Sequence, residues 1–413
     1  MKSDRKKHIL IISQYFYPET FRINDMAVEW VKRGYRVTVL TGIPNYPMGK
    51  YFDGYDLKHR RRETWNGVNI IRIPIIARGS SRNKIINAMG MIANYISFVI
   101  SGKFWVRKSN IGADLVYTFE VSPMTQALIG VAYSKRYHVP HYLYVTDLWP
   151  ENVETVTGIH NKIIIGSIQK MVDYIYMNTE RIFTCSRSFI SKIEARGIEK
   201  NKIEFWPQYA EDFYKPLPLE DELIPRDGII NLIFAGSVGY AQGLDILVEA
   251  SAKLKSENIL VRFVIIGDGR YLSEFQNNIS KKKVDDYFLF IPRQPMSEVP
   301  KYLAFADALL ITLAKSDVFA ITLPSKTQSC FACGKPIIVS ADGEIQDVVK
   351  EAGAGLCCSA EDIDGFVNIV KEFLMLNDAD KGRMASNALE YSQNHFDKER
   401  LMSRLDEVFS PGM

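Results

Sequence analysis

Short apolar segments alternate with helical patterns from the start of the chain. Residues 9–13 are typical of a buried strand, residues 23–32 have the apolar spacing of a helix that ends before Gly34, and residues 37–41 are again short and apolar. A strand, a helix and a second strand in this order are typical of a parallel sheet covered by helices on both faces. The chain is therefore predicted to be an α/β protein of the doubly wound class.

The same alternation returns after a proline-rich segment. Strand-like runs recur at 229–234 and 308–313, and the segment 206–225 before them has the composition of a linker. A chain of 413 residues also exceeds one ordinary hydrophobic core. We therefore predict an N-terminal domain at 1–208 and a C-terminal domain at 209–393.

Positive charge is concentrated in the first quarter of the chain. Residues 1–110 hold 20 Lys and Arg against 7 Asp and Glu, so a net charge of +13 there is offset by −10 in the remainder, for a total of +3. Such a block favours contact with an anionic surface or a phosphate-bearing ligand. No zinc finger, helix-turn-helix or base-stacking motif accompanies the charge, so no nucleic-acid partner is predicted.

The longest apolar-rich run is 85–106, with basic residues at its far end. Asn, Ser and Lys residues interrupt it, which argues against a membrane-spanning helix. We expect a helix that lies in the membrane interface, with Phe98, Phe104 and Trp105 inserted and the basic residues on the headgroups. An ordinary core helix is the alternative that the pattern leaves open.

The five cysteines are odd in number and irregularly spaced, which indicates a reducing compartment. Cys330 and Cys333 form a CxxC pair, but no histidine lies near them in sequence, so we expect buried core residues and no metal. Residues 1–7 are charged, and the apolar run after them is too short for a signal peptide. A cytoplasmic protein is therefore expected.

The segment 323–340 predicts a loop, a short helix that starts near Ser325, and a buried strand. Serine is a good N-cap and the first amides of a helix bind anions, so with Lys326 beside them this segment is a candidate diphosphate cradle. Such loop-helix-strand units are also common in α/β proteins without any ligand. Three further strand ends in this half carry glycine-rich or small polar loops, as a bound nucleotide requires.

Four landmarks of the second half stand in order: the glycine turn 236–243, the Gly-Asp-Gly at 267–269, the Ala-Asp-Ala at 306–308 and the Ala-Cys-Gly-Lys-Pro at 332–336. With these landmarks the chain resembles the family 4 glycosyltransferases, of the GT-B fold, over nearly its whole length.

Four more segments, 18–25, 44–47, 147–151 and 206–209, are similar to a branch of that family that builds bacterial O-antigens and capsules. That branch includes transferases of N-acetyl-L-fucosamine and related deoxy sugars.

The resemblance implies two Rossmann-like domains that face a cleft, with a nucleotide sugar, UDP-linked, held mainly by the C-terminal one. It implies transfer with retention of configuration, without a metal or a cofactor other than the nucleotide sugar as co-substrate. We expect the acceptor to be a lipid-linked saccharide diphosphate at the inner face of the cytoplasmic membrane, which would account for both the basic first quarter of the chain and the run 85–106. A terminal helix, within 394–413, would cross back to the N-terminal domain.

Three family features are missing. The usual pair of glutamates would fall on Ile321 and Ser329, and the usual lysine of the first phosphate loop is Gln242. The usual histidine of the N-terminal domain would fall near Thr146, which leaves Asp147 as the nearest titratable group. Contacts to the ribose and the phosphates must then come from other residues. The expected nucleotide-sugar contacts are Gly236, Ser237, Gly239, Gln242, Gly267, Gly269, Arg293, Pro324, Ser325, Ser329 and Glu344.

Transfer requires stabilisation of the leaving diphosphate, which we assign to backbone amides of the 236–237 turn and of Ser325, with Lys326 and Arg293 as cations. Asp147 and Glu151 follow a predicted strand and are the candidates for orienting or deprotonating the acceptor hydroxyl, although Asp147 could equally cap a helix. The expected acceptor-side residues are Glu19, Arg22, Asn45 and Tyr46.

Two other functions stay open at this point. A nucleotide-sugar epimerase of GT-B fold would convert the donor without an acceptor. A non-catalytic scaffold of a polysaccharide assembly complex would bind no nucleotide, and the missing glutamates make it a real alternative.

Overall fold

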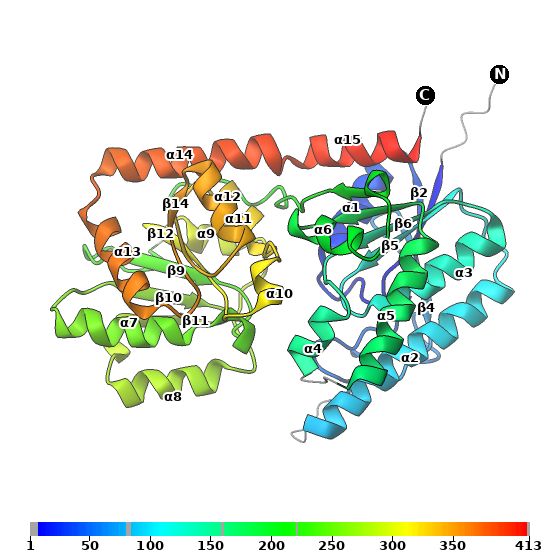
Figure 1. Cartoon of the computed structure of the whole chain (residues 1–413), viewed down its shortest axis with the longest axis horizontal. Helices are drawn as coiled ribbons and strands as arrows, with labels where there is room; N and C mark the ends of the chain where they lie inside the picture. Colours follow the sequence, from blue (N-terminus) through cyan, green and yellow to red (C-terminus); the bar gives the residue numbers. More distant parts are fainter. Residues whose placement is uncertain (1–6, 80–83, 158–160, 220–221, 411–413) are drawn as a thin grey trace. The chain divides into compact units, whose positions relative to one another are not determined.

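Two sheets organise the chain, one in each of the units Met1–Trp206 and Pro207–Met413 into which it divides. The structure is a computed structural model that describes residues 7–79, 84–157, 161–219 and 222–410 (Figure 1). The charged start of the chain, residues 1–6, lies outside them.

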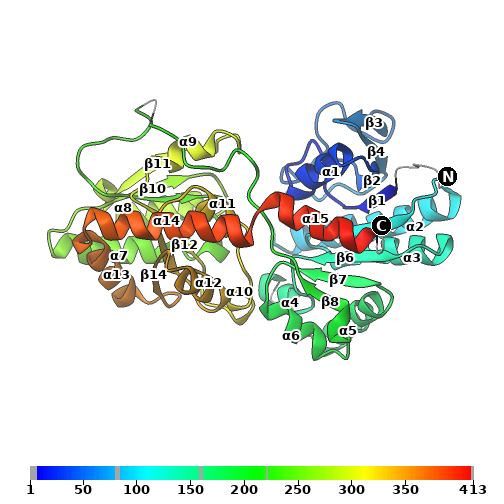
Figure 2. The ribbon, with the colours of Figure 1, turned by 90° about the horizontal axis from the view of Figure 1, so that it is seen from above.

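The first unit holds an eight-stranded sheet within the described residues. Its strands are β1 (His8–Ile12), β2 (Arg36–Gly42), β3 (Arg62–Trp65), β4 (Val68–Ile73), β5 (Leu115–Glu120), β6 (His141–Val145), β7 (Arg181–Thr184) and β8 (Ile203–Phe205). Its α-helices are α1 (Arg22–Lys32), α2 (Lys84–Lys108), α3 (Ala127–Tyr137), α4 (Glu151–Thr157), α5 (Lys162–Met177) and α6 (Ser188–Glu194). The spatial order is β3-β4-β2-β1-β5-β6-β7-β8 (Figure 2), and only the β3–β4 pair is antiparallel.

Helices cover both faces of this sheet. On one face α2 and α3 contribute side chains such as Phe98 and Ile129 to a core that includes Val116 of β5. Since side chains alternate along a strand, the next residue, Tyr117, points to the other face, where its ring lies 5.1 Å from that of Trp30 in α1. The carboxyl ends of the strands are thus left for the loops.

Helix α2 corrects two of the three side chains that were predicted to insert into a membrane from 85–106. Phe98 is fully buried in the core, and Trp105 is partly buried with its ring 6.4 Å from that of Tyr133. Of the three aromatic residues expected in the interface, only Phe104 is exposed. No helix in the described part of the chain is long and apolar enough to cross a membrane.

The second unit holds a six-stranded sheet within its described residues, and all of its strand pairs are parallel. Its strands are β9 (Asn231–Ala235), β10 (Arg262–Ile266), β11 (Phe288–Ile291), β12 (Ala308–Thr312), β13 (Ile337–Ser340) and β14 (Gly355–Cys358), in the order β11-β10-β9-β12-β13-β14. Its α-helices are α7 (Asp245–Ser256), α8 (Leu272–Lys282), α9 (Val299–Leu303), α10 (Asp317–Ala320), α11 (Lys326–Ala332), α12 (Glu344–Ala352), α13 (Ile363–Met375), α14 (Asp378–His395) and α15 (Lys398–Phe409).

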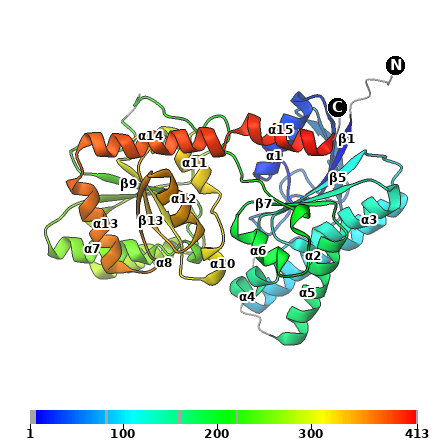
Figure 3. The same cartoon turned by 45° about the horizontal axis from the view of Figure 1, so that its top comes forward.

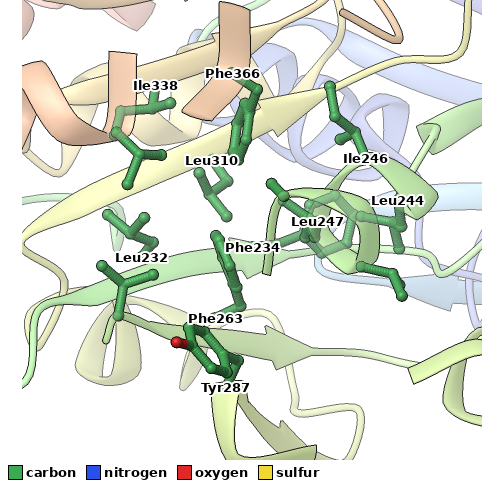
Figure 4. Packing of buried hydrophobic residues seen from close by; sticks show 14 of the residues in the cluster. Leu232, Phe234, Leu244, Ile246, Leu247, Phe263, Tyr287, Leu310, Ile338 and Phe366 are labelled. Carbon is green, nitrogen blue, oxygen red and sulfur yellow. The ribbon is translucent and has the colours of Figure 1, made fainter. Parts of the chain in front are cut away.

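Alternate residues of β9 belong to two different cores. Phe234 packs with Leu310 and with Phe366 of α13, on the face that α7 and α8 also cover (Figure 4). Ile233 packs on the opposite face, which α9, α11, α12 and α14 cover through residues such as Phe331 (Figure 3). Helices on both faces of a parallel sheet confirm the predicted doubly wound architecture.

Candidate functional site

Two glycine-containing turns lie against each other at the carboxyl ends of β9 and β10. A Cβ atom on Gly267 would lie 1.9 Å from the carbonyl oxygen of Gly236, and one on Gly269 would lie 2.0 Å from that of Val238. Gly267 also has a φ of 147°, in the range that favours glycine. The close contact of the two turns therefore already requires these glycines.

Two backbone N–H groups of the first turn are used in hydrogen bonds to the end of β10 and to the second turn. The Gly236 N–H donates to the Ile266 carbonyl at 2.9 Å, and the Val238 N–H donates to the Asp268 carbonyl at 2.9 Å. The amide of Ser237, between them, forms no hydrogen bond with another described residue. Of the two amides of this turn that were expected to bind phosphate, only that of Ser237 is therefore left without a backbone partner among the described residues.

Lys326 brings α11 to the same turn. Its ammonium lies 2.6 Å from Oε1 of Gln242 and 3.7 Å from the centre of the Phe234 ring. A Cβ atom on Gly236 would lie 3.3 Å from Nζ. Since Gln242 is the only hydrogen-bond acceptor of this ammonium among the described residues, two of its three N–H groups have no partner there.

Burial lowers the pKa of Lys326 to about 7. Burial in an apolar environment favours the neutral amine, and no carboxylate is paired with the ammonium to offset the effect. An anion at this position would supply the missing charge and the missing acceptors. The residue where the family usually has a lysine, Gln242, here acts as the acceptor for Lys326.

Buried polar atoms without a partner surround the start of α11, and the sequence did not reveal them. Oγ1 of Thr327, Oε1 of Gln328 and Oγ1 of Thr312, at the end of the neighbouring strand β12, are buried and form no hydrogen bond with described residues. Buried polar atoms usually have a partner, and water or a ligand can supply it.

The remaining donor-side candidates differ in their surroundings. Ser325 is exposed with helical backbone angles, and its hydroxyl forms no capping bond, so the predicted side-chain cap of α11 is wrong. Arg293 is exposed after β11 and has no partner among described residues. Ser329 is buried within α11, and Glu344 is buried at the first residue of α12. Pro324 and Gly239 are partly exposed in loops.

In the first unit, the side chain of Glu19 links two loops through hydrogen bonds. Its buried carboxylate accepts hydrogen bonds from the amides of Asn45 and Tyr46, at 2.8 and 2.7 Å. Burial raises the pKa of Glu19 to about 7. Three of the four predicted acceptor-side residues therefore form one cluster, and Arg22 lies nearby in sequence as the first residue of α1, partly exposed.

A chain of amide side chains extends this cluster. Nε2 of Gln14 donates to Oδ1 of Asn94 at 2.6 Å, and Nδ2 of Asn94 donates to Oδ1 of Asn45 at 3.3 Å. Oε1 of Gln14 is buried without a partner. The Arg78 guanidinium lies 5.5 Å from the centre of the Tyr46 ring. The sequence did not point to Gln14 or Asn94, because each lies among apolar neighbours.

Asp147 lies beside the buried carboxyl group of Glu120, which the sequence did not indicate as a site residue. Its Oδ2 accepts from the Ser122 amide at 2.9 Å, and its own amide donates to Oε2 of Glu120 at 3.3 Å. Burial and the Asp147 charge raise the pKa of Glu120 well above its ordinary value. Asp147 itself is partly exposed. Glu151 lies at the start of α4, partly buried.

No metal site is visible in the parts of the chain that the structure describes, since no three His, Cys, Asp or Glu side chains there gather around one point. Cys330 and Cys333 are buried, and burial raises the pKa of both thiols above the ordinary value.

The sequence of the chain is similar to those of known glycosyltransferases. Residues 221–391 match the family model described as glycosyl transferases group 1. The chain is 22% identical to the putative colanic acid biosynthesis glycosyl transferase WcaI of Escherichia coli K12. The alignment runs over 414 residues and covers 95% of this chain and 97% of WcaI. It is also 22% identical, over 198 residues and 48% of each chain, to the amylovoran biosynthesis glycosyltransferase AmsK of Erwinia amylovora.

Two solved structures illustrate the fold. Sucrose-phosphate synthase from Thermosynechococcus elongatus superposes with a TM-score of 0.75 at 15% identity and covers 98% of both chains. Anabaena HepE in complex with UDP and glucose superposes with a TM-score of 0.69 at 14% identity, covering 97% of this chain and 99% of its own. Such low identities show a shared fold and leave the substrate of this chain to other arguments.

Proposed function

We propose that this chain is a family 4 glycosyltransferase of the GT-B fold, and we propose its donor, its acceptor and its location. It transfers a sugar from a UDP-sugar, with retention of configuration and without a metal, to a lipid-linked saccharide diphosphate. The sugar is N-acetyl-L-fucosamine or a related deoxy sugar, as the resemblance of segments 18–25, 44–47, 147–151 and 206–209 to that branch suggests. The reaction takes place at the inner face of the cytoplasmic membrane, in polysaccharide assembly.

One observation carries the donor part of the proposal: the ammonium of Lys326 lies at the Gly236 turn with too few partners. When the bond between the anomeric carbon and the diphosphate oxygen breaks, negative charge accumulates on the diphosphate. Lys326 and the Ser237 amide are placed to stabilise this charge.

The choice of UDP is supported by relatives of the same fold. Two solved structures hold uridine nucleotides: HepE of Anabaena in complex with UDP and glucose, and trehalose-6-phosphate from Escherichia coli bound with UDP-2-fluoro glucose. The polysaccharide role is supported by relatives named for colanic acid and amylovoran biosynthesis.

The acceptor part of the proposal rests on the first unit. Asp147, whose amide donates to the buried Glu120, orients or deprotonates the acceptor hydroxyl. The cluster of Glu19, Asn45 and Tyr46 contacts the acceptor saccharide, since aromatic rings and amides are suited to sugar hydroxyl groups.

Isothermal titration with UDP and GDP tests the donor site. We expect UDP to bind more tightly than GDP, and Lys326→Ala to weaken UDP binding by about 10- to 100-fold, the loss of one charged hydrogen bond. Lys335→Ala is the matched control, because Lys335 is also partly buried but donates to the carbonyl of Ala304 at 2.7 Å. Absence of binding for both nucleotides would overturn the proposal.

A further inference from the structure

Helix α2 buries one face and leaves the opposite face exposed. Its buried face repeats every fourth residue, through Asn94, Phe98, Gly102 and Val106. At Gly102 the helix lies so close to α3 that a Cβ atom would be 2.2 Å from Cδ1 of Ile129. The orientation of α2 about its axis is therefore determined by tight packing.

The exposed face carries large apolar side chains along the length of the helix. These are Ile86 (58% exposed), Met89 (65%), Ile92 (46%), Ile96 (51%), Ile100 (64%) and Phe104 (57%), called the α2 stripe below. Their spacing of three or four residues places them in one line on a helix. With a rise of about 1.5 Å per residue, the line is about 27 Å long. A continuous exposed apolar surface of this kind marks an interaction site.

The charged side chains of α2 itself are all positive. Lys103, Arg107 and Lys108 are exposed at its carboxyl end, and the Lys108 ammonium lies 4.4 Å from the centre of the Phe104 ring. The helix contains no Asp or Glu. An occupant that is apolar in its interior and anionic at its surface matches both features.

We propose that the α2 stripe lies in the headgroup region of a bilayer that contains anionic lipids, with the apolar side chains inserted and the three basic residues on the headgroups. A second copy of the chain is less suited to this surface, because α2 offers no carboxylate to neutralise the basic end of another α2. The inference deepens the proposed function, since it identifies the surface that brings the enzyme to a lipid-linked acceptor.

The buried face of α2 connects this surface to the acceptor side. Asn94 donates to the carbonyl of Ile76 at 2.6 Å and bonds with Gln14 and Asn45 on its other sides. The helix that lies on the bilayer thus also holds the loops at the carboxyl ends of β1 and β2.

Flotation with vesicles tests the proposal on the intact protein. We expect wild type to bind vesicles of phosphatidylcholine with phosphatidylglycerol. The double variant Ile96→Glu/Ile100→Glu should bind at least about tenfold more weakly, because it replaces inserted apolar side chains with charge. Leu260→Glu/Met375→Glu, at exposed apolar positions of the second unit, is the matched control and should bind like wild type.

A second variant tests the electrostatic part. Lys103→Gln/Arg107→Gln/Lys108→Gln should lose about fivefold per charge on anionic vesicles and nothing on phosphatidylcholine alone. Titration with UDP, which the proposal leaves unchanged in all variants, shows that each variant is folded and separates this test from that of the donor site. Equal vesicle binding by wild type and Ile96→Glu/Ile100→Glu would overturn the proposal. So would a wild-type dimer in solution that this double variant converts to a monomer.

Discussion

At the scale of single residues, Lys326 is the most informative side chain in the second unit. Burial lowers its pKa to about 7, below the ordinary value of a lysine, so the free protein holds it largely as the neutral amine at higher pH. A bound diphosphate favours the ammonium. Binding therefore takes up a proton wherever Lys326 is neutral beforehand.

This linkage predicts a fall in UDP affinity as the pH rises above 7. The fall should approach about tenfold per pH unit, because the protonated fraction of the amine falls tenfold with each pH unit above its pKa. Isothermal titration between pH 7 and pH 9, in two buffers with different ionisation enthalpies, measures both the affinity and the proton uptake. In Lys326→Arg the guanidinium stays charged, so its affinity should not depend on pH; equal slopes in the two proteins would contradict the assignment.

Residues such as Lys326 and Asp147 could be selected from the sequence, because polar residues at strand ends are recognisable from local pattern. The side chains that they contact in the fold could not be predicted from the sequence. Gln242 lies 84 residues from Lys326, and Glu120 ends a strand of six residues whose pattern shows only burial. Which distant side chains meet depends on the pairing of strands across the sheet.

At the scale of elements, the packing of α2 on α3 depends on the absence of a side chain at one position. Gly102→Ala should lower the free energy of unfolding by about 1–3 kcal/mol, because the added methyl group overlaps Ile129. The substitution also gains about 1 kcal/mol of helix propensity, which the overlap outweighs. Denaturation in urea, followed by circular dichroism, measures the change.

Gly166→Ala in α5 is the matched control. A Cβ atom there meets nothing within 4 Å, so only the gain in helix propensity remains, and this variant should be more stable than wild type. If both alanine variants were equally stabilised, the close approach of α2 and α3 would be wrong, and with it the orientation of the α2 stripe.

At the scale of the whole molecule, the two proposed contacts fall in different units. Hydrogen exchange on the intact protein should show the strongest protection by UDP in 234–243 and 323–328. Anionic vesicles should protect α2 most and leave the second unit unchanged. Protection of α2 by UDP alone, or of 234–243 by vesicles alone, would contradict this division of the two contacts.

The sequence by itself determined the α/β class, the repetition of strand and helix in two halves, and the glycine and polar loops at strand ends. These features follow from local periodicity and turn chemistry, which act over a few residues. The exposed face of α2 was decided only by the tertiary structure. Apolar residues occupy both faces of this helix, so their spacing could not distinguish Phe98, which packs in the core, from Phe104, which is exposed. Which face is buried is decided by the close packing of Gly102 against Ile129 of α3, since only the face of α2 that carries this glycine fits there.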